Sequence, residues 1–216
     1  MAKPSEKRLE HFHALVDYDR AQGGFGVSLA GMDEAGRGPL VGNVVTACVI
    51  MPSEPLYEWI DDSKKLSAAR RAELYEQIMA CAIYVGVGQA SPREIDEMNI
   101  LNATKLAMER AAEKAPAKLC IVDAVRGLYL PFATKAVVKG DATSYNVAAA
   151  SIVAKVTRDR QMLELAQKYP QYGFEHNMGY GTPEHIEALK RYGATPEHRA
   201  SFIGHFVSVQ GKGEAE

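Results

Sequence analysis

The stretch VSLAGMDEAGRGP, residues 27–39, decides the fold of this chain, because it joins an apolar run to a glycine-rich turn. Its first seven residues are mainly apolar and end at Asp33, which is typical of a buried strand. A second stretch, NVVTACVIM at 43–51, is rich in β-branched residues and predicts another strand. The residues between the two are rich in glycine, so we expect a hairpin-like connection.

The rest of the chain alternates between strand and helix patterns. Further strands are expected at 83–89, 119–122 and 136–138. Helices are expected at 6–20, at 68–82, from Pro92 to about 116, and from about Ser144 to 168, with Ser67 and Ser91 as N-caps of two of them. This order predicts an α/β fold in which a mixed five-stranded sheet is flanked by helices.

The domain organisation follows from the same patterns. We expect one core over residues 1–168, of which residues 1–25 form an N-terminal helical extension. Residues 169–216 carry turn signals and short helical patterns. We therefore expect them to form a small C-terminal helical segment that ends in a frayed tail.

Composition excludes several classes of protein. The 216 residues are 47% apolar and 24% charged, which excludes disorder as the main state. A net charge of −2 argues against wholesale coating of nucleic acid by a basic domain, but it leaves a local basic groove open. Three scattered cysteines predict neither a disulfide framework nor a zinc site. This cysteine usage favours the cytosol, so we expect a cytoplasmic protein. We also expect no signal peptide and no membrane span.

Carboxylates follow three of the expected strands. Asp33 and Glu34 end the first, Asp123 follows LCIV, and Asp141 follows AVVKG. Because ligand sites of α/β sheets gather where strands end, we expect these side chains to converge. Converging carboxylates repel one another unless a cation lies between them, and oxygen ligands suit Mg²⁺ or Mn²⁺. The pattern therefore favours a metal-dependent nuclease or phosphotransferase.

Two points stay open at the level of the residues alone. Adjacent strand residues face opposite sides of a sheet, so Asp33 and Glu34 reach one site only if the strand ends or bulges there. Glu34 could instead contribute its backbone carbonyl. Asp159 competes with Asp141, but on one continuous helix their 18-residue separation is about 27 Å. The two cannot bind the same ions, and spacing does not say which one does.

Seven segments, in order along the chain, resemble the type 2 ribonuclease H family (RNase HII). They are DEAGRGP at 33–39, DSKKLS at 62–67, NILNATKLAM at 99–108, the VD of IVD at 122–123, KGDATSYNVAAASIVAKVTRDRQM at 139–162, GYGT at 179–182 and HRASF at 198–202. One such motif would be weak evidence, whereas seven in the right order are specific. The chain is identified on these motifs as a member of that family.

The resemblance implies a fold and an activity. It implies an RNase H-like core, hydrolysis of the RNA strand of RNA–DNA hybrids, and incision 5′ of single ribonucleotides in duplex DNA during repair. It implies two Mg²⁺ or Mn²⁺ ions, products with 3′-hydroxyl and 5′-phosphate ends, and a monomeric enzyme. The family's metal-binding and catalytic carboxylates correspond to Asp33, Glu34, Asp123 and Asp141, which selects Asp141 over Asp159.

The resemblance also assigns substrate contacts. Gly36, Arg37 and Gly38 resemble the family's reader of the 2′-hydroxyl, where glycine lets the backbone approach a sugar closely. Tyr180 resembles the aromatic residue that stacks on the neighbouring deoxyribose. The expected phosphate contacts are Lys64, Lys65 and Asn99. Further candidates for the basic groove are Lys139, Lys155 and Arg158. Each of these residues also fits a solvated surface position.

Two other functions and one departure from the family remain. A non-catalytic module that binds hybrids would need a broken carboxylate set, and none is visible. A related metal-dependent DNA nuclease of the same fold would gain nothing from a 2′-hydroxyl reader.

Ala124 stands where the family usually has glycine, so a left-handed backbone there would be costly. His185, His198 and His205 lack the spacing of a helical zinc site and are expected to have structural or surface roles.

Overall fold

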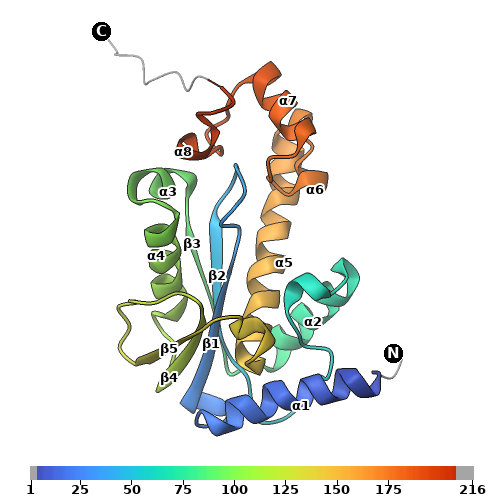
Figure 1. The fold of residues 1–216 in the computed structure, drawn as a ribbon, viewed down its shortest axis with the longest axis vertical. Coiled ribbons are helices and arrows are strands. Elements are labelled where there is room, and N and C mark those ends of the chain that lie inside the picture. Colours follow the sequence, from blue (N-terminus) through green and yellow to red (C-terminus); the bar gives the residue numbers. More distant parts are fainter. Residues whose placement is uncertain (1–3, 208–216) are drawn as a thin grey trace.

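A mixed five-stranded sheet forms the centre of the fold (Figure 1). The computed structural model describes residues 4–207. The strands β1 (Leu29–Ala35), β2 (Val44–Ile50), β3 (Tyr84–Ala90), β4 (Leu119–Asp123) and β5 (Ala133–Val137) lie in the order β3-β2-β1-β4-β5. β1 and β2 form the expected antiparallel hairpin, whereas β4 runs parallel to β1 and β5. The predicted mixed five-stranded sheet is confirmed.

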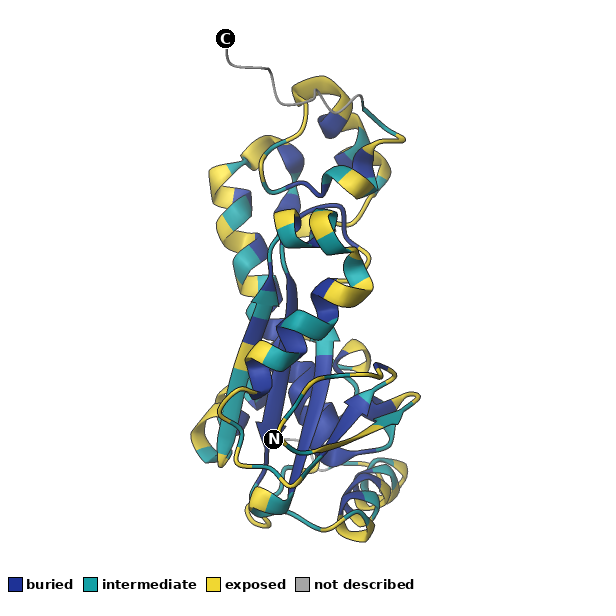
Figure 2. Cartoon of the chain, turned by 90° about the vertical axis from the view of Figure 1, so that its left-hand side faces the viewer, coloured by how far each residue is buried: buried dark blue, intermediate teal, exposed yellow. Residues whose placement is uncertain are grey.

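Helices cover both faces of the sheet (Figure 1). On one face α5 (Tyr145–Lys168) packs on β1 and β2, and α1 (Glu6–Ala21) and α2 (Ala68–Cys81) pack against α5. On the other face α4 (Ile100–Ala112) packs on β3 and β2 beside α3 (Pro92–Met98). Figure 2 shows that the inner strands are buried while the outer turns of the helices are exposed. This layering confirms the α/β class.

Glycines set how closely the helices approach the sheet. A Cβ at Gly31 of β1 would lie 2.1 Å from the carbonyl carbon of Asn146 at the start of α5. Cβ atoms at Gly86 and Gly88 of β3 would each lie 1.9 Å from a carbonyl oxygen of α4. No side chain fits in such gaps, so these positions keep both helices in direct contact with the strands.

The boundaries of three elements differ from the predictions. Gly26–Ser28 forms a 3₁₀ turn, so β1 begins at Leu29 and not at residue 27. The fifth strand spans Ala133–Val137 and not 136–138. Its first residues are exposed and lack an apolar pattern, so the sequence does not indicate where it starts. One expected helix after Pro92 is two helices, separated at Asn99, whose φ is 71°.

The C-terminal residues pack back onto the turn after β1. α5 ends at Lys168 and is followed by α6 (Phe174–Asn177), α7 (Pro183–Tyr192) and α8 (Ala200–Ile203). Val41 packs with Met162, Tyr172 and Phe174 in one apolar cluster. The division into a core and a C-terminal segment at residue 168 stays a prediction, and the expected frayed tail lies outside the described residues. No helix in the described range is long and apolar enough to cross a membrane.

Candidate active site

Three carboxylates meet at the edge of the sheet. Asp33 lies on β1, Asp123 ends β4, and Asp141 lies in the 3₁₀ turn Gly140–Ala142 just before α5. One oxygen atom from each of the three lies within 4.8 Å of the others. β1 and β4 are parallel neighbours, so their carboxyl ends reach the same edge. The predicted convergence of these three positions is therefore present in the structure.

Backbone contacts hold this cluster in shape. The N–H of Gly140 donates a hydrogen bond of 2.7 Å to Oδ1 of Asp123, which ties the end of β4 to the turn carrying Asp141. The N–H of Glu34 donates a bond of 2.7 Å to Oδ1 of Asp33. Lys139 adopts a left-handed conformation, with φ 58°, that turns the chain from β5 toward Asp141. The carboxylates are thus oriented before any ligand arrives.

The three aspartates crowd negative charge into a mostly buried site. Asp33 and Asp141 are only 5% and 6% exposed. Burial raises the pKa of Asp33 well above its usual value, and the charges of Glu34, Asp123 and Asp141 raise it further. Burial also raises the pKa of Asp141. Lys64 places its Nζ 3.9 Å from Oδ2 of Asp141. Crowded carboxylate oxygens of this kind fit divalent cations with a preference for oxygen ligands.

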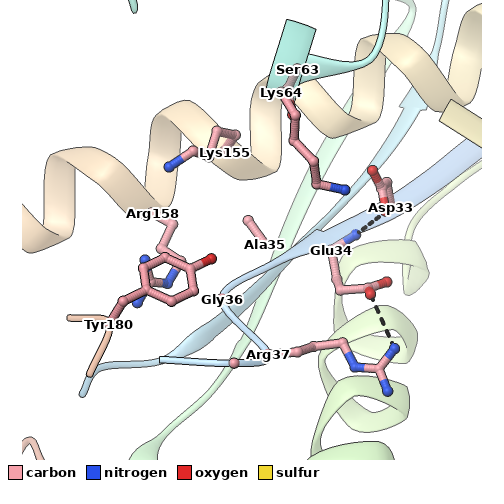
Figure 3. Close-up of a pocket in the computed structure, with 11 residues that line it drawn as sticks. Asp33, Glu34, Ala35, Gly36, Arg37, Ser63, Lys64, Lys155, Arg158 and Tyr180 are labelled. Carbon is pink, nitrogen blue, oxygen red and sulfur yellow. Dashed lines mark hydrogen bonds and ion pairs between the residues drawn. The ribbon is translucent and has the colours of Figure 1, made fainter. Parts of the chain in front are cut away.

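Glu34 lies next to the cluster but not in it. β1 continues through Ala35 in regular register with β2, so no bulge turns Glu34 to the side of Asp33. Its Oε1 accepts a hydrogen bond of 3.3 Å from Arg37, and its buried Oε2 has no partner among the described residues (Figure 3). Burial raises the pKa of Glu34, and the charge of Asp123 raises it further. The role of Glu34 as a metal ligand stays a prediction.

Asp159 lies apart from the cluster. It accepts a 2.5 Å ion-pair contact from Lys155 one turn earlier on α5. Asp141 stands before the start of the same helix and Asp159 near its middle. Of the two positions that spacing left open, the structure brings Asp141 to the other carboxylates.

Two adjoining cavities open beside the carboxylates. The first, of about 270 Å³, contains the predicted reader and stacking residues together with basic side chains (Figure 3); it is lined by Asp33, Glu34, Ala35, Gly36, Arg37, Gly38, Ser63, Lys64, Lys155, Arg158 and Tyr180. The second, of about 560 Å³, includes Asp123, Asp141, Lys65 and Lys139. Lys64 lines both cavities, so the two are neighbours on one surface.

The expected phosphate contacts divide into two groups. Lys64 and Lys65 lie beside the carboxylates, although Lys65 also forms an ion pair of 3.3 Å with Asp61. Asn99 lines neither of the two cavities. Its side-chain oxygen accepts hydrogen bonds from the N–H groups of Leu101 and Asn102 and so caps α4. A role for Asn99 in substrate binding stays a prediction.

The two histidines form a buried, neutral pair. Thr195 donates its N–H to Nδ1 of His198, so the proton of His198 is on Nε2. That nitrogen lies 3.2 Å from Nε2 of His185, which must accept, and His185 therefore donates from Nδ1 to the carbonyl of Tyr180. Burial lowers the pKa of both, to about 4 for His198. Their geometry matches the expected structural role.

One residue without a role assigned by any sequence motif is prominent in the structure. Arg199, in the HRASF segment, is completely buried and contacts the turn that contains Gly36. Its hydrogen-bond acceptors are backbone carbonyls. Because every residue has a carbonyl, no side-chain pattern in the sequence could have signalled this contact.

The sheet order and the carboxylates at its edge define an RNase H-like hydrolase. The family model for ribonuclease HII matches residues 30–205. The chain belongs to the ribonuclease HII family and is a ribonuclease H.

Curated relatives and solved structures agree with this assignment. The chain is 50% identical over 196 residues to ribonuclease HII of Geobacillus kaustophilus, covering 89% of this chain and 75% of the relative. It is 54% identical over 180 residues to that of Polynucleobacter asymbioticus, covering 81% and 92%. Among solved structures, RNase HII of Archaeoglobus fulgidus, determined in a complex with PCNA, superposes with a TM-score of 0.69 at 29% identity and covers 80% of this chain and 93% of its own. Ribonuclease H2 of Pyrococcus horikoshii gives 0.65 at 32% identity, with 80% and 92% covered.

Proposed function

We propose that this ribonuclease H cuts the RNA strand of RNA–DNA hybrids and incises duplex DNA on the 5′ side of a single embedded ribonucleotide. The observation that carries the proposal is the adjacency of two features. The carboxylate cluster of Asp33, Asp123 and Asp141 adjoins a cavity lined by Gly36, Arg37, Gly38 and the ring of Tyr180. Chemistry and sugar recognition would then occur side by side.

The donor set fits divalent metal ions. Asp33, Asp123 and Asp141 would hold two Mg²⁺ or Mn²⁺ ions, with Glu34 completing their ligands through its side chain or its carbonyl. When bound, such ions lower the pKa of a water and stabilise the departing 3′-oxygen, leaving 3′-hydroxyl and 5′-phosphate ends. The unpartnered Oε2 of Glu34 and the crowding of the three aspartates are the features that support this fit.

The basic side chains around the cluster would orient the duplex. Lys64 lies 3.9 Å from Asp141 and lines both cavities, so it can contact the phosphate that is cut. Lys139 extends positive charge along the same surface, and Lys155 lines it as well, in an ion pair with Asp159. Contacts of this kind place a strand without reading its sequence, so selectivity must come from the sugar.

The ring of Tyr180 is well placed to select the sugar. It is 48% exposed, and a Cβ at Gly38 would lie 3.7 Å from its Cε1. A deoxyribose next to the ribonucleotide could stack on this ring, whereas a further 2′-hydroxyl would crowd it. The glycines allow the backbone of residues 36–38 to approach the ribose on the other side.

A duplex carrying one ribonucleotide tests the proposal. The 5′-labelled duplex is incubated with the enzyme in Mg²⁺ or Mn²⁺, beside an all-DNA duplex and an RNA–DNA hybrid. We expect one cut, 5′ of the ribonucleotide, that disappears in EDTA, and an uncut all-DNA duplex. Equal cutting of both duplexes would instead identify a DNA nuclease, and binding without any cut would identify a hybrid-binding module.

A further inference from the structure

Arg199 holds the turn after β1 through its main chain. The side chain is completely buried at the start of α8. Its Nη2 donates to the carbonyls of Gly36 and Gly42 at 2.7 and 2.8 Å, Nη1 to that of Arg37 at 3.0 Å, and Nε to that of Gly42 at 2.9 Å. None of these acceptors is a carboxylate. Burial, together with the charge of Arg158, lowers the pKa of Arg199 to about 9.

These bonds fix the direction of two amide groups. In a trans peptide the carbonyl of one residue and the N–H of the next point in opposite directions. Because Arg199 binds the carbonyls of Gly36 and Arg37, the N–H groups of Arg37 and Gly38 point away from it. No hydrogen bond among the described residues uses either N–H group. Both residues line the first cavity, so two oriented donors remain free there.

A second buried arginine joins this turn to the one that carries Tyr180. Arg158, on α5, donates from Nη1 to the carbonyl of Met178 at 3.0 Å and from Nη2 to that of Val41 at 3.2 Å. Its side chain also lies against the Cα of Gly36. Both guanidinium groups therefore bind the turn after β1, and Arg158 also binds the turn that carries Tyr180. All of these hydrogen-bond acceptors are backbone oxygens.

The geometry points to Arg199 as a positioning residue for substrate selection. It holds residues 36–42 so that the N–H groups of Arg37 and Gly38 donate to the 2′-oxygen of the ribose at the cut site, and Arg158 keeps Tyr180 in register with them. This inference rests on the proposed function. Arg199 does not contact substrate and acts only through the main chain it holds.

Binding selectivity tests this role separately from folding. All variants are made in the Asp33→Asn background, and their affinities for a one-ribonucleotide duplex and an all-DNA duplex are measured by fluorescence anisotropy. Arg199→Lys keeps the charge but lacks the planar fork needed to reach three carbonyls. We expect the ratio of the two affinities to fall at least about tenfold, with affinity for the all-DNA duplex unchanged. Arg191→Lys, the same change at an exposed position of α7, should leave the ratio at its starting value.

A second measurement does not depend on the variant folding. The amide resonances of Arg37 and Gly38 in ¹⁵N-labelled protein, again with Asp33→Asn, should shift downfield with the ribonucleotide duplex and not with the all-DNA duplex. Unmoved resonances, or an unchanged affinity ratio in a folded Arg199→Lys protein, would overturn the inference. If the parent protein itself shows no preference for the ribonucleotide duplex, the proposed function fails and the inference fails with it.

Discussion

Gly36 and Arg158 are in direct contact: a Cβ placed on Gly36 would lie 2.1 Å from Nε of Arg158. The φ of Gly36 is 91°, which also disfavours any side chain. We therefore expect Gly36→Ala to lower the free energy of unfolding by about 2 kcal/mol or more and to remove most cleavage activity. Urea denaturation and initial cleavage rates measure the two effects.

Gly38→Ala is the matched control for this prediction. A Cβ on Gly38 would make an ordinary contact of 3.7 Å with Tyr180, and its φ is not positive. Its stability should stay within about 0.5 kcal/mol of the wild type. Equal stability of the two alanine variants would show that the contact with Arg158 is not a packing constraint.

The ring of Tyr180 should matter more than its hydroxyl. Tyr180→Phe keeps the exposed ring and should cleave a one-ribonucleotide duplex at nearly the wild-type rate. Tyr180→Ala removes the stacking surface, and stacking on an aromatic ring is worth about 1–3 kcal/mol. We expect kcat/KM to fall roughly 10-fold to 100-fold with little change in Tm. A large loss in the phenylalanine variant would transfer the role from the ring to the hydroxyl.

Ala124 carries backbone strain next to the carboxylate cluster. Its φ is 50°, the left-handed conformation that the sequence marked as costly at this position. Ala124→Gly should raise the free energy of unfolding by about 0.5–1 kcal/mol, because the relief of strain exceeds the added freedom of the unfolded chain. Denaturation curves test this, with Ala72→Gly on the exposed face of α2 as a control that should lose about 1 kcal/mol. A destabilised Ala124→Gly protein would contradict the account.

The buried histidine pair should make stability depend on pH. The pKa of His198 is lowered to about 4 in the folded protein, so the unfolded chain, with a pKa near 6.5, binds more protons between these values. The pair's contribution is therefore complete above about pH 6.5 and lost as the pH falls toward 4, on the order of 2 kcal/mol. His198→Asn keeps an acceptor for the N–H of Thr195 but does not titrate. Urea denaturation at pH 7.5 and 4.5 should show a smaller loss in this variant, and an equal loss would exclude the pair as the cause.

Strong local patterns made most of the fold predictable. β1 is apolar up to Asp33, β2 is apolar or β-branched throughout, and Ser67 and Ser91 cap helices where expected. The start of β5 was not predictable, since Ala133 and its neighbours are exposed at the sheet edge. The break at Asn99 was also not predictable, because it uses a positive φ without a glycine or proline to signal it.

The candidate site also has a part that could be predicted from the sequence and a part that could not. Asp33, Asp123 and Asp141 could be proposed from their places after strands and from the family resemblance, and the structure brings them together. Spacing alone could not choose between Asp141 and Asp159, since only the position of the turn before α5 decides it. The contacts of Arg199 required the folded chain, because they join residues far apart in sequence through backbone oxygens.

The most direct test of the carboxylate site compares Asp141→Asn with Asp159→Asn. Both changes remove one negative charge and keep the shape of the side chain. Asp141 lies just before α5, and Asp159 lies on it. Initial rates are measured in Mg²⁺ on a duplex with one ribonucleotide. We expect Asp141→Asn to lose at least about 100-fold, since metal-assisted stabilisation is worth several kcal/mol, and Asp159→Asn to stay within about threefold of the wild type. The opposite order, or near-wild-type cleavage by Asp141→Asn, would contradict the assignment of the active site.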